Sequence, residues 1–434
     1  MRPLGIRAPP VAPYTIVETD PFLRGLSVGP RQTLPTSCWI YCAACTCSYI
    51  LLALPWTYYI LLRVVTDASI KSFVMVQDEL VQQFCHVGLT IENITYNTWW
   101  PGCGHDFPSQ TCTEPCYDIG LLEDMDAFNK NNPGKRVTFQ SRPGAGHDGS
   151  PIGVVELEGW WLPAPNEPAA PRIVLQHGFT ENSNKAFQQL AAYTLRSIGF
   201  SVLVPNFRDH CYSSNTSEDV VQWSNAYPLD LLGAWDYAVS DPGGLLGGPR
   251  EPGQVGLQGF SMGAFVTAIA LGLEGRAPAA WVDSGPWTTE VAFAQNFRTT
   301  AEEVGLGFMS GLLLPRVWEG VSKAALERGV DYYWQLPQQT LPLGPDTRRP
   351  IYAHANVDDA TVPFSEHVRL MDFLAQYPQK YAVGNWVSSG FCHGSAHHRE
   401  ILSKHEEYKD RLCTFWTEAF DLEPSYCSYG PALK

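Results

Sequence analysis

A serine between two glycines stands in the stretch Val255–Phe265, which reads VGLQGFSMGAF. Ser261 follows a short apolar run that predicts a strand and precedes a run that predicts a helix, in the pattern G-x-S-x-G with Gly259 and Gly263. A sharp strand-to-helix turn projects a serine hydroxyl toward a base, and it crowds the neighbouring residues. We therefore expect Ser261 to be a nucleophile and both glycines to be required by the turn.

Attack by a serine on a carbonyl creates an oxyanion, which backbone N–H groups stabilise. Met262 begins the helix after the serine, so its N–H and the positive end of the helix dipole face the developing charge. The run Ile173–Gln176 predicts a strand that ends in His177-Gly178-Phe179. We expect the N–H of Phe179 to be the second oxyanion donor.

An acid and a base are required beside the serine, and both occur downstream in that order. The strand predicted at Pro350–His354 is followed by a turn with two aspartates, Asp358 and Asp359. The loop after the last predicted strand contains three histidines, which are His393, His397 and His398. From the residues alone, either aspartate and any of the three histidines can complete a Ser-acid-His set.

These residues are carried by a pattern of alternating strands and helices from Arg136 onward. The expected strands are Arg136–Ser141, Val154–Leu162, Arg172–Gln176, Ser201–Pro205, Gln254–Gln258, Ala279–Asp283, Pro350–His354 and Lys380–Val383. The expected helices are Ala186–Ser197, Leu229–Ser240, Met262–Leu273 and one near Arg399–Phe420. Short apolar strands between helices predict a mostly parallel eight-stranded sheet with helices on both faces. The first two strands are joined by a loop and should be antiparallel.

Further motifs give the chain a family resemblance. Gly159-Trp160-Trp161-Leu162-Pro163, Arg208-Asp209-His210-Cys211-Tyr212-Ser213 and Asp283-Ser284-Gly285-Pro286 accompany the serine motif, the acidic turn and the histidine loop. With these, residues 136–420 resemble an α/β-hydrolase, in the branch of monoacylglycerol-lipase-like and serine-aminopeptidase-like enzymes and their membrane-anchored relatives. The resemblance implies the α/β-hydrolase fold and an acyl-enzyme on the serine, and it requires no metal and no organic cofactor.

The resemblance also selects among the open alternatives. An acidic turn of the form D-x-x-V-P selects Asp359, and a loop of the form G-x-x-H-G selects His393, whose following glycine leaves the loop free to turn. The family pattern Arg-Gly-His-Gly has Asp209 and Cys211 in place of its glycines, so we expect that loop to have a different shape.

Composition bounds the partners. The chain has 434 residues, with 29 Lys+Arg against 44 Asp+Glu and a net charge of −15, which argues against nucleic acid as a partner. Residues 38–62 contain no charged residue and are long enough to cross a bilayer. We therefore expect a flexible cytosolic tail (1–37), a transmembrane helix (38–62), a stalk with a cysteine-containing segment (63–135) and a catalytic domain (136–434).

The arginines before the predicted span place the N-terminus in the cytosol and the large domain in a lumenal or extracellular space. Two glycosylation sequons, at Asn93 and Asn215, are consistent with this topology. In an oxidising compartment the eight cysteines beyond the span can form disulfides. These are Cys85, Cys103, Cys112, Cys116, Cys211, Cys392, Cys413 and Cys427.

The sequence thus predicts a membrane-anchored serine hydrolase that cleaves a carboxylic ester, with a lipid ester as the leading substrate because the domain is tethered beside a bilayer. An amidase or peptidase of the same fold and a non-catalytic hydrolase-like scaffold are the alternatives. The apolar, glycine-punctuated segment 305–315 either lines an acyl pocket as a mobile lid or forms an ordinary core helix on the sheet.

Overall fold

The structure is a computed structural model that describes residues 36–82, 85, 119–165, 170–216, 219–390 and 396–429. The chain divides into two units, one ending at Ile60 and the other running from Leu61 to the C-terminus. The second unit contains the sheet and all the candidate site residues that the structure describes.

An eight-stranded sheet in the order β1-β4-β6-β5-β7-β8-β9-β10 forms the centre of the second unit. Strand β4 is antiparallel to β1 and to β6, and every other neighbouring pair is parallel. The mostly parallel eight-stranded sheet with an antiparallel first pair is therefore confirmed. The strands are β1 Lys135–Gln140, β4 Glu156–Leu162, β5 Arg172–Gln176, β6 Ser201–Pro205, β7 Val255–Phe260, β8 Ala280–Asp283, β9 Arg349–Asn356 and β10 Tyr381–Ser388.

The central strands are buried along their whole length, because helices cover both faces of a parallel sheet. Every residue of β5, β6, β7 and β8 is buried. Ile173 and Leu175 of β5 point into a core shared with one layer of helices, while Val174, between them, points to the other face. This alternation leaves the carboxyl ends of the parallel strands as the edge where polar side chains gather.

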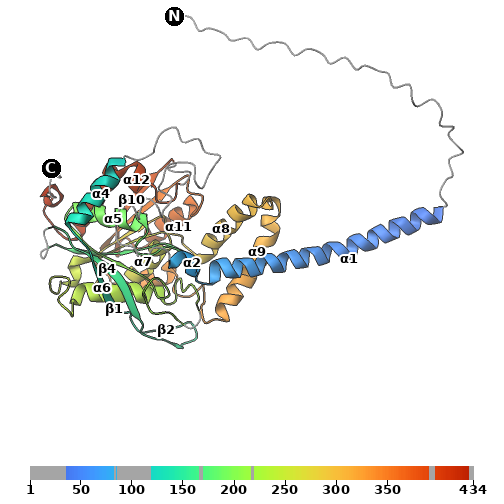
Figure 1. The fold of residues 1–434 in the computed structure, drawn as a ribbon, viewed down its shortest axis with the longest axis horizontal. Coiled ribbons are helices and arrows are strands. Elements are labelled where there is room, and N and C mark those ends of the chain that lie inside the picture. The colour runs from blue at the N-terminus through green and yellow to red at the C-terminus, as the bar shows by residue number, and fades with distance from the viewer. Residues whose placement is uncertain are drawn as a thin grey trace, which may run out of the picture. The chain divides into compact units, whose positions relative to one another are not determined.

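The two helical layers are distinguished by their contacts. Helices α6 and α7 contact each other and the sheet, and α10 contacts α7, whereas α5 contacts α4, α12 and α13. Helix α11 contacts β9 and β10. In Figure 1, α4, α5 and α12 lie on one side of the sheet and α6 lies on the other. The helices are α4 Ile119–Asn131, α5 Ala186–Ser197, α6 Tyr227–Ser240, α7 Met262–Leu273, α10 Pro337–Thr340, α11 Phe364–Leu374, α12 Glu400–Ser403 and α13 His405–Ala419.

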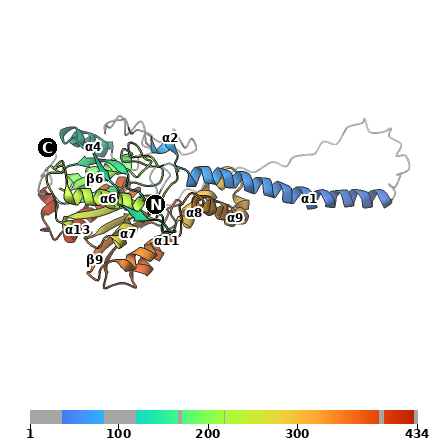
Figure 2. The ribbon, with the colours of Figure 1, turned by 90° about the horizontal axis from the view of Figure 1, so that it is seen from below.

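The connection after β8 forms a pair of helices, α8 Thr289–Glu303 and α9 Gly307–Leu326, which lie beside the sheet in Figure 2. Helix α9 packs chiefly against α8 and against the segment η2, Ile70–Val74. Phe308 and Leu312 of α9 are exposed, and Leu313 is buried. The segment 305–315 therefore contains the turn between the two helices of this pair and the first part of α9, and it is not a core helix on the sheet.

The N-terminal part of the chain includes helix α1, Thr36–Ser69, which contains Pro55. Among the residues that the structure describes, no helix combines the length and the apolarity of a membrane span. After α1, residues 70–82 and Cys85 belong to the second unit, and Phe73, Val74 and Val81 are buried. The short elements are α2 Asp78–Val81, β2 Gly144–Ala145, β3 Pro151–Ile152, η3 Pro252–Gln254, η4 Leu341–Leu343 and η5 Tyr426–Tyr429.

Two disulfides lie in the described residues. Cys85–Cys211 joins the segment after α1 to the loop after β6, and Cys413–Cys427 joins α13 to η5. Both pairs are among the cysteines for which the sequence predicted disulfides. Cys103, Cys112, Cys116 and Cys392 lie outside the described residues.

Candidate active site

The turn between β7 and α7 holds Ser261 at φ 53° and ψ −121°, in the left-handed region that a residue with a side chain rarely adopts. A Cβ at Gly259 would collide with the backbone of Gly263, and a Cβ at Gly263 would collide with the carbonyl oxygens of Gln176 and His177. The predicted need for both glycines therefore follows from the packing of the turn. The N–H of Ser261 donates to the carbonyl of Asp283 at 2.8 Å, which ties the turn to the neighbouring strand.

The acidic turn after β9 orients the carboxylate of Asp359, which is 7% exposed. Its Oδ1 accepts from the N–H groups of Thr361 at 2.7 Å and Val362 at 2.9 Å. Its Oδ2 lies 2.6 Å from Nδ1 of His397. The other aspartate, Asp358, is exposed and accepts from the N–H of Gly390 at 2.8 Å. Of the two aspartates, Asp359 is therefore the one that orients a histidine.

His397 is the histidine that this carboxylate contacts. Burial lowers the pKa of His397, but the neighbouring Asp359 carboxylate raises it by more, so the pKa lies above the ordinary value. The ring of His398 lies 4.3 Å from that of His397 and 5.8 Å from that of Phe260, the residue before Ser261. The histidine pair thus lies beside the turn that carries the serine.

The preferred histidine of the sequence analysis, His393, lies outside the described residues, so its assignment stays a prediction. The structure gives the contact with Asp359 to His397, which was one of the alternatives. The glycine after His393 indicates a flexible loop, but which histidine contacts Asp359 depends on where the helix after the loop begins. His397 stands three residues before Glu400, the first residue of α12. The start of this helix is the feature that could have indicated His397 from the sequence.

The loop after β5 approaches the nucleophile closely at Gly178. A Cβ there would lie 3.3 Å from Cβ of Ser261 and 3.0 Å from Oε2 of Glu181. The N–H of Gly178 donates to this Glu181 carboxylate at 3.0 Å, which fixes the turn just before Phe179. Phe179 therefore follows a residue in contact with the serine, where the sequence predicted an oxyanion donor.

His177, in the same loop, is held as a neutral ring. Its Nδ1 lies 3.0 Å from the carbonyl of Gly178, and its Nε2 accepts from the N–H of Phe207 at 3.4 Å, so the proton is on Nδ1. Burial, with a smaller contribution from His210, holds the pKa of His177 well below its ordinary value. With both ring nitrogens engaged by backbone groups, His177 is a structural residue.

Aromatic side chains surround the ring of Phe179. It lies 5.7 Å from the ring of Trp223 and 5.5 Å from that of Phe73, which the segment after α1 contributes. Phe73 also contacts Phe293 of α8 and Tyr332. The segment that follows α1 is thus part of the wall beside the loop of Gly178, and nothing in the sequence between residues 63 and 135 had indicated this contact.

In the loop after β6, the two residues that stand where the pattern Arg-Gly-His-Gly has glycine both have a positive φ. Asp209 has φ 66° and Cys211 has φ 51°. The different loop shape expected from the sequence stays a prediction. Side-chain bonds offset the strain of about 1–2 kcal/mol per residue, because Asp209 accepts from the N–H and the hydroxyl of Thr216 and Cys211 is held by the disulfide to Cys85.

No protein-family model matches the sequence, and no curated protein matches it. Solved structures to which the chain is similar include the esterase Pf2001 of Pyrococcus furiosus, at 19% identity over 71% of this chain and 99% of that one, with a TM-score of 0.48. A puromycin-hydrolysing peptidase of Mycobacterium tuberculosis is 21% identical over 65% and 40%, with a TM-score of 0.43.

An acylaminoacyl peptidase of Pyrococcus horikoshii is 18% identical over 68% of this chain and 43% of that one, with a TM-score of 0.44. Likeness at this level carries no argument about activity. The assignment of a function therefore rests on the geometry of the site.

Proposed function

We propose that the chain is a serine hydrolase that cleaves a carboxylic ester through an acyl-enzyme on Ser261. The observation that supports this most strongly is the bond of 2.6 Å between Asp359 and His397 at the sheet edge where the left-handed turn presents Ser261. Parallel strands bring their carboxyl ends to one edge, so the residues after β7, β9 and β10 share it. The proposal takes His397, in place of His393, as the base.

In the proposed reaction, Oγ of Ser261 attacks the carbonyl carbon and its proton moves to Nε2 of His397. Asp359 keeps the other imidazole proton on Nδ1 and stabilises the imidazolium. The N–H groups of Phe179 and Met262 hold the oxyanion, and each contributes about 3 kcal/mol if well aimed. His397 then returns the proton to the leaving alcohol. Water, deprotonated by His397, attacks the acyl-enzyme and releases the carboxylic acid and the free serine.

Hydrolysis of a p-nitrophenyl ester by wild type and Ser261→Ala tests the proposal. Ser240→Ala, at an exposed serine of α6, is the matched control. We expect the Ser261 variant to lose turnover by about 10³-fold or more and the control to keep it. Equal turnover of all three proteins would refute the proposal. Turnover of the p-nitroanilide with the same acyl group, measured beside that of the ester, decides between the ester hydrolase and the amidase or peptidase alternative. The scaffold alternative requires that neither the ester nor the anilide is turned over.

The lipid substrate and the membrane tether belong to this proposal as its finer part. Their support is the charge-free run 38–62 and the arginine bias before it, and Asn215 of the second sequon is exposed. Glycosidase treatment should increase the mobility of the expressed protein, and the change should be lost in Asn93→Gln/Asn215→Gln. Digestion of the large domain by protease added to intact microsomes would contradict the topology.

A further inference from the structure

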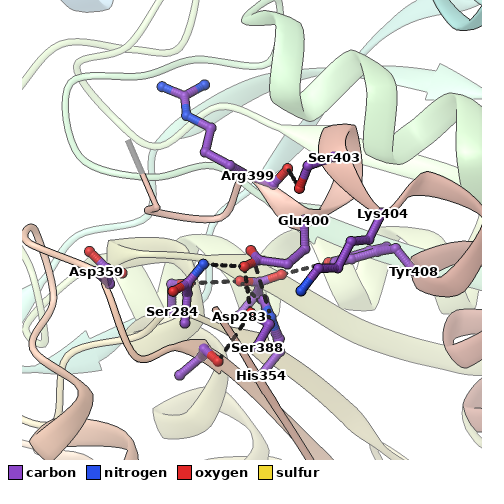
Figure 3. A network of polar contacts seen from close by, with 12 residues as sticks. Asp283, Ser284, His354, Asp359, Ser388, Arg399, Glu400, Ser403, Lys404 and Tyr408 are labelled. Carbon is purple, nitrogen blue, oxygen red and sulfur yellow. Dashed lines mark hydrogen bonds and ion pairs between the residues drawn. The ribbon is translucent and has the colours of Figure 1, made fainter. Parts of the chain in front are cut away.

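A second Ser-His-Asp arrangement lies buried beneath the candidate site, where Figure 3 shows His354 between acidic groups. Nδ1 of His354 lies 3.0 Å from Oδ1 of Asp283, and its Nε2 lies 3.1 Å from Oγ of Ser388. Oε2 of Glu400 lies 3.7 Å from the same Nε2. The side chains of His354 and Asp283 have no exposed surface, and that of Glu400 is 2% exposed.

This arrangement differs from a nucleophilic one in where the serine proton goes. The hydroxyl of Ser388 donates to Oε1 of Glu400, so it accepts from His354 and cannot pass a proton to it. The ring of His354 is therefore a donor at both nitrogens, one toward Asp283 and one toward Ser388 and Glu400. A ring that donates from both nitrogens is an imidazolium.

The charges around the ring agree with that form. Burial lowers the pKa of His354, but the Asp283 carboxylate, with Glu400, raises it by more, and Asp283 has a lowered pKa because His354 outweighs its own burial. Lys404, between α12 and α13, opposes the charge. Tyr408 of α13 donates to Oδ2 of Asp283 at 2.6 Å.

Two further histidines face this group, His367 of α11 and His398. Burial lowers the pKa of each, and the charge on His354 lowers it further. The ring of Trp386 on β10 lies 4.3 Å from that of His354. If His354 lost its proton, two buried carboxylates would face each other with only neutral donors between them, which is costly.

The network connects the three segments that carry the proposed catalytic residues. Asp283 accepts the N–H of Ser261 through its carbonyl. Asn356, at the end of β9, donates to Glu400 and to the carbonyl of Gly390, and its Oδ1 accepts from the N–H of Asp358 at 2.8 Å. Glu400 begins α12, three residues after His397. The serine turn, the acidic turn and the histidine loop are thus bonded to one buried cluster.

We propose that His354, held as a cation between Asp283 and Glu400, is a positioning residue that sets the relative places of Ser261, Asp359 and His397. The inference rests on the proposed function. A buried histidine with a raised pKa adds stability that is complete below its ordinary pKa of about 6.5 and is lost as the pH rises through the raised pKa. Catalysis should therefore have an alkaline limb at which turnover falls while KM stays the same.

Glu400→Gln tests this because it keeps an oxygen for Ser388 and Asn356 but removes the negative charge. His354 should then lose its proton more easily, and the alkaline limb of kcat should move about one pH unit lower, with KM within about twofold of wild type. Glu407→Gln, at an exposed glutamate of α13 paired with Arg411, is the control and should leave the limb in place. A second variant, His354→Gln, should have a lower kcat at every pH and no alkaline limb of this origin.

A limb that is unmoved in Glu400→Gln, or moved equally in Glu407→Gln, would overturn the inference. If neither network variant folds, the wild type still decides, because a kcat that stays flat from about pH 7 to about pH 10 in folded protein would also overturn it. Labelling of Ser261 by a fluorophosphonate separates the two proposals. Labelled wild type with an unmoved limb leaves the hydrolase proposal standing, whereas an unlabelled Ser261 removes it.

Discussion

Replacing Asp359 with asparagine should disable the site through the tautomer of His397. Oδ1 of Asp359 accepts two backbone N–H groups, from Thr361 and Val362, so an asparagine must place its carbonyl oxygen there. The reverse orientation would leave both N–H groups unpaired, that of Thr361 half-buried and that of Val362 buried, at about 1–3 kcal/mol each and about 2–6 kcal/mol together. In the favoured orientation, with the oxygen toward Thr361 and Val362, the amide NH2 faces Nδ1 of His397. It forces the ring proton onto Nε2, which can no longer accept from Ser261.

That orientation energy sets the size of the effect. At about 0.6 kcal/mol for RT, 2–6 kcal/mol makes the productive tautomer rarer by about 30-fold to about 10⁴-fold, and kcat should fall within this range. Asp358→Asn is the control, because its exposed carboxylate accepts one N–H, from Gly390, and asparagine keeps that acceptor. The ester turnover of both variants gives kcat, and their thermal unfolding shows that each is folded. A kcat of Asp359→Asn within tenfold of the wild-type value, or a larger loss of kcat in Asp358→Asn than in Asp359→Asn, would refute the reasoning.

Three further predictions address the base, its titration and the loop after β6. His397→Gln should lose turnover by about 10³-fold while His393→Gln keeps it, measured on one ester, and the opposite order would return the base to His393. Because the pKa of His397 is raised and a base must be unprotonated, kcat/KM should increase with pH through a midpoint above about 6.5, and a midpoint below this would contradict the Asp359 contact. Burial raises the pKa of Asp209 to about 6, above its unfolded value, so its contribution to stability is greatest in acid and is lost as the pH rises through about 6. Asp209→Asn should therefore be more stable than wild type at about pH 7.5, by at most about 3 kcal/mol, and similar to it at about pH 4. Urea unfolding at both pH values measures the difference, and a variant that is no more stable than wild type at about pH 7.5 would contradict this prediction.

The local pattern of the sequence predicted the central elements well. The bounds of β5 and of α5 and α7 are those that the sequence predicted. In β5 and α7 a run of mostly apolar residues coincides with burial, so the local signal and the packing agree. The order of the strands was not predicted, because it depends on packing between segments far apart in the chain.

The last strands and the last helix show where the local pattern fails. Strand β9 extends to Asn356 and β10 to Ser388, beyond the predicted ends at His354 and Val383. The added residues include polar side chains that no apolar pattern identifies as strand, and the buried network satisfies two of them, Asn356 and Ser388. The single helix predicted near 399–420 is instead two, α12 and α13, which Lys404 separates.

The candidate site was predictable where a motif fixes the backbone and less so where a loop must fold back. Ser261 lies at the predicted turn, and Asp359 is the aspartate that contacts a histidine. The position of His397 depends on α12, because Glu400, the first residue of that helix, is bonded to the buried cluster around His354. The glycine after His393, from which we inferred a flexible loop, carries no information about that bond. The segment after α1 lay equally beyond a local argument, since its place follows from Phe73 and from the disulfide of Cys85.

Mass spectrometry of the protein after reaction with a fluorophosphonate tests the central claim most directly. The account predicts one adduct per chain, on the peptide that contains Ser261, and no adduct in Ser261→Ala. An adduct on another residue, or equal labelling of wild type and variant, would contradict it.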